Sequence, residues 1–273
     1  MGVLNVTPDS FSDGGLWLDP EAALRHAIDM VAEGADIVDV GGESTRPGAT
    51  AVPEEEELRR VLPVIEALAG ELAAPISIDT RKPAVADAAL TAGASILNDT
   101  CGEEMDPAMD EVAAGHGAGL VIMHSRGNPS TMKSLTDYDD VVRHVTSFLT
   151  RRADQAVAAG VPTDSIALDP GIGFAKTAEQ SLRLLGELGE LVGMGWPVVV
   201  GTSRKSFIGT VLGVTEDERV EGTAASVAWA VACGAHIIRV HDVRPMTRVV
   251  RMTEAIVRAT AEPRGGLGGT ADR

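Results

Sequence analysis

Short apolar runs alternate with longer helical segments along the whole chain, and this alternation restricts its possible folds more than any other sequence feature. Each run is short and rich in β-branched or aliphatic side chains, and the segments between runs are rich in Ala, Leu and Glu. Repeated strand–helix units favour a parallel sheet with helices packed against it. There are eight such runs, at residues 2–6, 37–41, 76–80, 95–100, 120–124, 166–171, 198–203 and 237–241.

Eight strand–helix units in 273 residues predict a single α/β domain, a (β/α)₈ TIM barrel. We expect the barrel to occupy residues 1–260 and the Gly-rich segment 261–273 to be a disordered tail. An open doubly wound sheet would show fewer strands and a dinucleotide-binding loop. Residues 171–173 lack the third spaced glycine of such a loop, and Arg204 stands where a phosphate-binding loop needs glycine.

Charge and cysteine content limit the partners and the compartment. A net charge of −17 argues against nucleic acid or an anionic membrane as the main partner, because either would repel the chain. The two cysteines, Cys101 and Cys233, have no metal-ligand spacing and are expected as buried, reduced side chains. With no secretory signal pattern and no apolar run long enough to cross a bilayer, the sequence predicts a soluble cytoplasmic protein.

Polar side chains stand at the carboxyl ends of seven of the eight runs. In the second run, Asp39 lies mid-strand and the polar residues follow at 43–46. Because the carboxyl ends of barrel strands meet at one rim, these side chains predict an active site there. The rim residues are Asn5, Asp79, Asn98, Asp99, His124, Asp169, Ser203, Arg239 and His241.

The types of rim residue suggest two kinds of ligand group. Arg239 and His241 are two positions apart and suit a phosphate or pyrophosphate, although Arg239 could instead pair with Asp169 or Asp79 across the barrel. Planar acceptors and carboxylates at Asp79, Asn98 and Asp169 suit a flat ligand edged with N–H donors. Lys205, at a helix start, is either a further site residue or a solvated surface lysine.

Two features at the beginning of the chain allow both a functional and a structural interpretation. The amide oxygen of Asn5 is a plausible single protein ligand for Mg²⁺, and a turn-capping role is equally open. Residues 5–15, NVTPDSFSDGG, are richer in polar residues and glycine than a simple turn requires. They form either a linker or a functional loop.

Several long motifs together resemble the dihydropteroate synthase family, over residues 1 to about 260. They are MGVLNVTPDSFSDGG, DVGGESTRPGA, ISIDT, LNDT, VIMHSRGNPSTM, LDPGIGFAK, GTSRKSFIG and RVHDV, in that order. The resemblance implies a (β/α)₈ barrel that joins 6-hydroxymethyl-7,8-dihydropterin pyrophosphate to p-aminobenzoate, releasing pyrophosphate and giving 7,8-dihydropteroate. It also implies a Mg²⁺ cofactor, a homodimer formed through the later outer helices, and a sulfonamide target.

The resemblance assigns roles to residues at matching positions. Asp79, Asn98 and Asp169 would hold the pterin edge, Lys205 would contact the pterin ring, and Arg239 would stack on it. Lys205, Arg239 and Asp79 are the residues assigned to catalysis. The pyrophosphate site would consist of Thr45, Arg239 and His241, with Asn5 on the Mg²⁺. The p-aminobenzoate pocket would be lined by Phe11, Arg46, Pro47, Phe174 and Ser206.

In this family the polar segment after the first strand is a loop that closes over the bound pyrophosphate, which favours the functional interpretation of residues 5–15.

Two alternative functions remain open. A pterin-binding methyltransferase would lack this loop and the SRK segment at 203–205 and would need no pyrophosphate site. A non-catalytic pterin-binding paralogue would be expected to lose some of these residues. This chain also begins directly at its first strand, whereas family members usually carry residues ahead of it, so we expect either a misassigned start codon or a less covered barrel floor.

Overall fold

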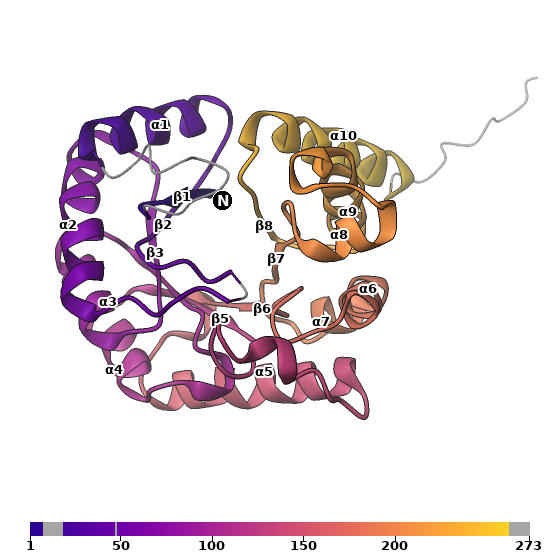
Figure 1. Cartoon of the computed structure of the whole chain (residues 1–273), viewed down its shortest axis with the longest axis horizontal. Coiled ribbons are helices and arrows are strands. Elements are labelled where there is room, and N and C mark those ends of the chain that lie inside the picture. The colour runs from indigo at the N-terminus through magenta and orange to yellow at the C-terminus, as the bar shows by residue number, and fades with distance from the viewer. Residues whose placement is uncertain (8–18, 47, 262–273) are drawn as a thin grey trace, which may run out of the picture.

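All eight expected strands are present in the computed structural model, which describes residues 1–7, 19–46 and 48–261 (Figure 1). Seven strands lie within their apolar runs, and β5 begins one residue before its run, at Gly119. The strands are β1 Gly2–Asn5, β2 Val38–Gly41, β3 Ile76–Thr80, β4 Ile96–Asp99, β5 Gly119–Met123, β6 Ile166–Asp169, β7 Val199–Gly201 and β8 Ile237–Arg239.

The strands form a closed parallel barrel. Strands β1 to β6 pair in chain order in one sheet, and β7 pairs with β8. Two parallel bridges join these sheets, from Leu168 to Val198 and from Gly2 to Val240. The second bridge is reinforced by hydrogen bonds from Val3 N to Val240 O at 3.0 Å and from Val240 N to Met1 O at 3.0 Å. The predicted (β/α)₈ barrel is therefore confirmed.

Helices surround the strands on the outside (Figure 1). Proline marks the start of the first three helices, where its fixed φ and missing N–H cost nothing. Asp19 also caps α1 by accepting a hydrogen bond from Glu21 N. The helices are α1 Pro20–Ala32, α2 Glu54–Glu71, α3 Pro83–Thr91, α4 Ala108–His116, α5 Val141–Ala158, α6 Ala178–Gly186, α7 Leu188–Val192, α8 Ser206–Leu212, α9 Val220–Ala232 and α10 Val243–Ala261.

Alternating strand residues divide the apolar side chains into two clusters. One set packs outward against the helices in a large core that includes Leu4, Val40 and Ile78. The other set is a small cluster of Val121, Ala167 and Val199 with Ile96 and Ile237 beside it. Because alternate strand side chains point to opposite faces, this small cluster occupies the barrel interior. Interior positions nearer the strand ends are polar, and they carry the candidate site.

Two sequence expectations lie outside the described residues, namely most of the 5–15 loop and the tail from residue 262. In the described part of the chain, no helix is both long enough and apolar enough to span a membrane.

Candidate active site

Arg239, at the end of β8, lies at the centre of the barrel mouth. Its Nε donates to Asp39 Oδ2 at 2.6 Å, and its Nη2 donates to Asp79 Oδ2 at 2.7 Å. The structural alternative in which Arg239 pairs with Asp79 is thus realised, and the second carboxylate is that of Asp39 and not of Asp169. Within the described residues, no hydrogen bond from Nη1 of this guanidinium is found, so this nitrogen is available to a ligand.

The carboxylates around Arg239 are themselves held in place. Asn98 Nδ2 donates to Asp39 Oδ2 at 3.1 Å, and Thr100 Oγ1 donates to Asp79 Oδ1 at 3.1 Å. Burial raises the pKa of Asp79 to about 7, although the Arg239 charge acts in the opposite direction. Three neighbouring strands, β2 to β4, therefore present one connected polar surface to the barrel interior.

Asp169 and Lys205 form the opposite side of the mouth. Asp169 Oδ1 accepts a 2.7 Å hydrogen bond from Gly171 N, and burial raises the pKa of this carboxyl. Lys205 Nζ donates to the carbonyl of Ile172 and lies 4.5 Å from the centre of the Phe174 ring. Burial lowers the pKa of Lys205 to about 8, and the nearby Asp169 charge opposes this shift. Lys205 is accordingly enclosed at the barrel mouth and is not a solvated surface lysine.

A strained turn before α8 directs Lys205 into the mouth. Arg204 has a φ of +55°, which is uncommon for a residue other than glycine. Its guanidinium is fixed by Asp242, with Nε and Nη2 at 2.8 and 2.7 Å from the two carboxylate oxygens. Its backbone N–H donates to Thr223 Oγ1 at 3.0 Å. These bonds hold a backbone conformation that the sequence alone does not reveal.

His241 lies two residues beyond Arg239, just after the end of β8. Its Nδ1 is 3.1 Å from Ser203 Oγ, which also accepts a 3.2 Å hydrogen bond from His241 N. Burial and the nearby charges of Arg239 and Arg46 lower the pKa of His241 to about 3. The imidazole is therefore neutral at pH 7, and it can offer a hydrogen bond to an anion without adding a charge.

The remaining predicted site residues are divided between described and undescribed parts of the chain. Asn5 is partly buried at the end of β1 and lies beside Gly41. Thr45 is partly buried, and Arg46 pairs with Glu216 at 3.1 Å. Ser206 is exposed at the first position of α8. Phe11 and Pro47 lie outside the described residues.

Sequence reasoning missed two buried charged residues at this rim. Asp39 was noted only for its mid-strand position, although its side chain is fully buried and binds Arg239. Lys176 was given no role, yet it is buried behind the loop that carries Phe174. A charged residue inside an apolar run, as at Asp39, is the only sequence signal that could have identified the first.

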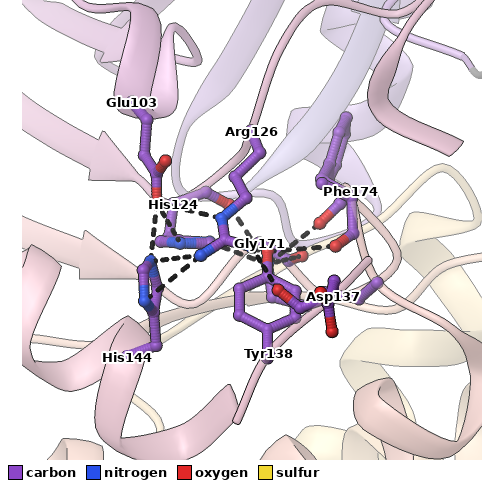
Figure 2. A network of polar contacts seen from close by, with 10 residues as sticks. Glu103, His124, Arg126, Asp137, Tyr138, His144, Gly171 and Phe174 are labelled. Atoms are coloured by element: carbon purple, nitrogen blue, oxygen red, sulfur yellow. Dashed lines mark hydrogen bonds and ion pairs between the residues drawn. The ribbon is translucent and has the colours of Figure 1, made fainter. Parts of the chain in front are cut away.

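A second polar cluster lies outside the barrel mouth, where Figure 2 shows Glu103, His124 and His144 turned toward one another. One potential ligand atom from each lies within 4.8 Å of the others. The Arg126 guanidinium enters the same group, with Nε 3.2 Å from Glu103 Oε1 and Nη2 3.2 Å from His144 Nε2. A fixed positive charge at this distance opposes a metal cation, so we assign the cluster a structural role.

Comparison with known proteins places this geometry in a family. The model of the pterin-binding enzymes matches residues 1–241. The dihydropteroate synthase of Synechocystis is 50% identical over 259 residues, which cover 94% of this chain and 90% of the relative.

Solved structures agree with this match. The dihydropteroate synthase of Yersinia pestis in complex with a sulfonamide drug superposes with a TM-score of 0.90 and 43% identity, covering 95% of this chain and 94% of that chain. The Xanthomonas albilineans dihydropteroate synthase with 4-aminobenzoic acid gives a TM-score of 0.87 and 44% identity, covering 96% and 93%.

Proposed function

This chain belongs to the dihydropteroate synthase family of pterin-binding enzymes, and from this premise we propose how its residues perform the family's reaction. The chain condenses 6-hydroxymethyl-7,8-dihydropterin pyrophosphate with p-aminobenzoate and releases pyrophosphate. The observation that carries this conclusion is the Arg239 cluster. Two carboxylates bind this guanidinium, Asn98 donates to one of them, and Nη1 makes no hydrogen bond to a described residue. Such a group can bind a flat heterocycle and a pyrophosphate side by side.

The pterin edge would lie against Asp79, Asn98 and Asp169. Carboxylates accept hydrogen bonds from the amino and ring N–H groups of a pterin, and the amide of Asn98 can both donate and accept. Lys205 would donate to the ring oxygen and nitrogen from the other side of the mouth, and Arg239 would stack on the ring. Fixed partners on both sides would orient the reacting methylene group toward the open rim.

The pyrophosphate would be bound by Thr45, Arg239 and His241. Asn5 fits a Mg²⁺ ligand, because its carboxamide makes no side-chain hydrogen bond to any described residue and its neighbour Gly41 leaves space beside it. Mg²⁺ takes few protein ligands and binds phosphate oxygens, so a single amide oxygen is sufficient from the protein. When bound, the ion would neutralise charge on the leaving group.

We propose a dissociative reaction sequence. The bond between the methylene carbon and the pyrophosphate oxygen breaks first, and its electron pair leaves with pyrophosphate, which Arg239 and His241 stabilise. The arylamine nitrogen then bonds to the cationic methylene carbon and loses one proton to solvent. A rate that barely changes with arylamine nucleophilicity would support this order, whereas a steep dependence would contradict it.

The p-aminobenzoate pocket is proposed at Phe11, Arg46, Pro47, Phe174 and Ser206. The rings and Pro47 would flank the arylamine, and Arg46 or the Ser206 hydroxyl would bind its carboxylate. A sulfonamide of similar shape would compete for the same pocket, as expected from the drug complex of the Yersinia pestis relative.

A homodimer in the cytoplasm is proposed as the working form. Exposed apolar side chains gather on the later helices α8, α9 and α10, namely Val211, Leu212, Trp229, Met252, Ile256 and Val257. Such side chains favour a protein–protein contact. Sedimentation of the protein as a monomer at micromolar concentration would contradict the dimer.

The proposed function is tested by product formation from purified protein, the pterin pyrophosphate, p-aminobenzoate and Mg²⁺. Wild-type protein should form dihydropteroate, and Asn5→Ala, Asp169→Ala and Arg239→Ala should each reduce the rate by about a hundredfold or more. Pterin binding without product in the wild type would instead indicate a binding-only paralogue. Full activity of Arg239→Ala would contradict the proposed pyrophosphate site.

A further inference from the structure

Lys176 lies at the end of the loop between β6 and α6, and the reaction proposed above gives it no task. Its side chain is buried, and its Nζ lies 3.0 Å from Gly171 O, 2.9 Å from Phe174 O and 2.9 Å from Nδ1 of His124. Burial lowers the pKa of Lys176 well below its usual value. In either protonation state its Nζ can donate to the two carbonyls, and the direction of its bond with Nδ1 depends on the His124 tautomer. Two of the three partners are backbone carbonyls of the same loop, so Lys176 ties this loop to the end of β5.

The loop needs these stabilising contacts because its backbone is strained at Ala175. Gly171, Gly173 and Ala175 have φ values of +64°, +81° and +47°. Glycine adopts this region freely, but Ala175 does so only when its surroundings hold it there. The Tyr138 hydroxyl donates to Ala175 O at 3.0 Å, which fixes the same turn from outside. Lys176 stabilises the same turn from its buried side, through Gly171 O and Phe174 O.

This loop carries groups that face the active site. The carbonyl of Ile172 accepts a hydrogen bond from Lys205, and the Phe174 ring lies 4.5 Å from the same ammonium. The N–H of Gly171 donates to Asp169. Phe174 belongs to the loop itself, so its position depends directly on the conformation that Lys176 stabilises, whereas Asp169 and Lys205 lie on other segments and only contact the loop.

His124, the partner of Lys176 outside the loop, is held rigidly. The His124 ring is fully buried and packs edge-on against Phe148, with ring centres 5.0 Å apart. Its backbone N–H donates to Asp169 O at 2.9 Å. Figure 2 shows His124 between Glu103 and the loop residues Gly171 and Phe174. A side chain fixed in this way gives Lys176 an immobile partner.

We propose that Lys176 is a positioning residue that sets the shape of the arylamine pocket by holding Phe174 and the Ile172 carbonyl in place. The proposal rests on the function proposed above, in which Phe174 lines the p-aminobenzoate site. Lys176 touches neither substrate and acts through the loop. Its loss should therefore affect arylamine binding more than the other steps.

Lys176→Met tests the proposal, because methionine keeps an unbranched apolar side chain and removes the amine that makes these three contacts. Compared with wild type, we expect the KM for p-aminobenzoate to rise about tenfold or more, while kcat changes less than about threefold. Lys133→Met is the matched control, because Lys133 is exposed in the described structure, and it should leave both constants unchanged. An unchanged KM in Lys176→Met, or an equal loss in all constants, would overturn the proposal.

Hydrogen exchange gives a readout that needs no substrate. In Lys176→Met the amides of residues 171–177 should exchange about tenfold faster or more, while β6 keeps its protection. Lys176→Gln retains two N–H donors and should be intermediate in both measurements; it replaces the methionine variant if that variant does not fold. Failure of both variants to fold would overturn the proposal, because Lys176 would then be needed for the whole barrel. If the wild type makes no product, the proposed function fails. Faster exchange in Lys176→Met would still show that Lys176 stabilises the loop.

Discussion

Arg239 Nε and Asp39 Oδ2 are 2.6 Å apart, although the two residues lie 200 positions apart in the chain. The bond joins β8 to β2 across β1, which lies between them. It therefore forms only when the barrel has closed. Asp39 is fully buried, and its Oδ1 has no hydrogen-bond partner among the described residues. The candidate site is thus built around a buried ion pair that forms only in the complete fold.

Asp39→Asn should test how much this pair matters. Asparagine keeps the shape but removes the charge that faces Arg239, so we expect the free energy of unfolding to fall by about 3 kcal/mol. Urea denaturation measures this change. Asp36→Asn, at a nearby exposed position, should stay within about 0.5 kcal/mol of wild type. Equal effects in both variants would show that the pair contributes no specific stability.

Much of the fold was predictable from the sequence because the apolar runs are short, regular and separated by clear helix starts. All eight strands coincide with the predicted runs to within a few residues, and the first three helices begin at or directly after a Pro residue. Residues at strand ends, such as Asp79 and Asn98, could be placed at the rim because parallel strands end together. Their exact hydrogen-bond partners could not, because these depend on barrel closure.

The parts that sequence reasoning could not predict depend on backbone conformation or on distant contacts. Arg204 has a left-handed backbone that no local pattern requires, and it is held by Asp242 from the next strand–helix unit. In the sequence Lys176 is an ordinary lysine before a helix, and only the folded loop shows that its Nζ is enclosed by carbonyls. Such positions become visible only in three dimensions.

Activity should fall at alkaline pH because of Lys205. Burial lowers the pKa of this group to about 8, so it is a cation below that pH and a neutral amine above it. Since the cation is proposed to donate to the pterin, kcat/KM for the pterin pyrophosphate should decrease about tenfold per pH unit above pH 8. Lys205→Arg should remove this decrease, because arginine stays charged. A wild-type profile that is flat to about pH 9.5 would contradict the assignment.

A second buried ion pair lies away from the site and should affect stability alone. Arg152 donates from Nη1 and Nη2 to the two carboxylate oxygens of Asp110, both at 3.0 Å, and both side chains are buried. Arg152→Met leaves Asp110 without this partner and should lower the free energy of unfolding by about 3–5 kcal/mol. Arg151→Met, next to it and exposed, should change it by less than about 1 kcal/mol. A raised KM for either substrate in folded Arg152→Met would show that this pair also supports the site.

Gly171→Ala should disrupt the contact between the β5 end and the β6–α6 loop. A Cβ at this position would lie 1.8 Å from the carbonyl oxygen of His124, and the backbone already has a φ of +64°. Neither the carbonyl nor the left-handed backbone can adapt cheaply, so we expect a loss of more than about 3 kcal/mol in the free energy of unfolding. Gly186→Ala is the matched control, because a Cβ there meets nothing within 4 Å at the end of α6. That variant should equal wild type or gain about 0.5–1 kcal/mol. Thermal denaturation of both proteins provides the comparison, and a Gly171→Ala protein as stable as Gly186→Ala would mean that the loop moves away from His124 at little cost.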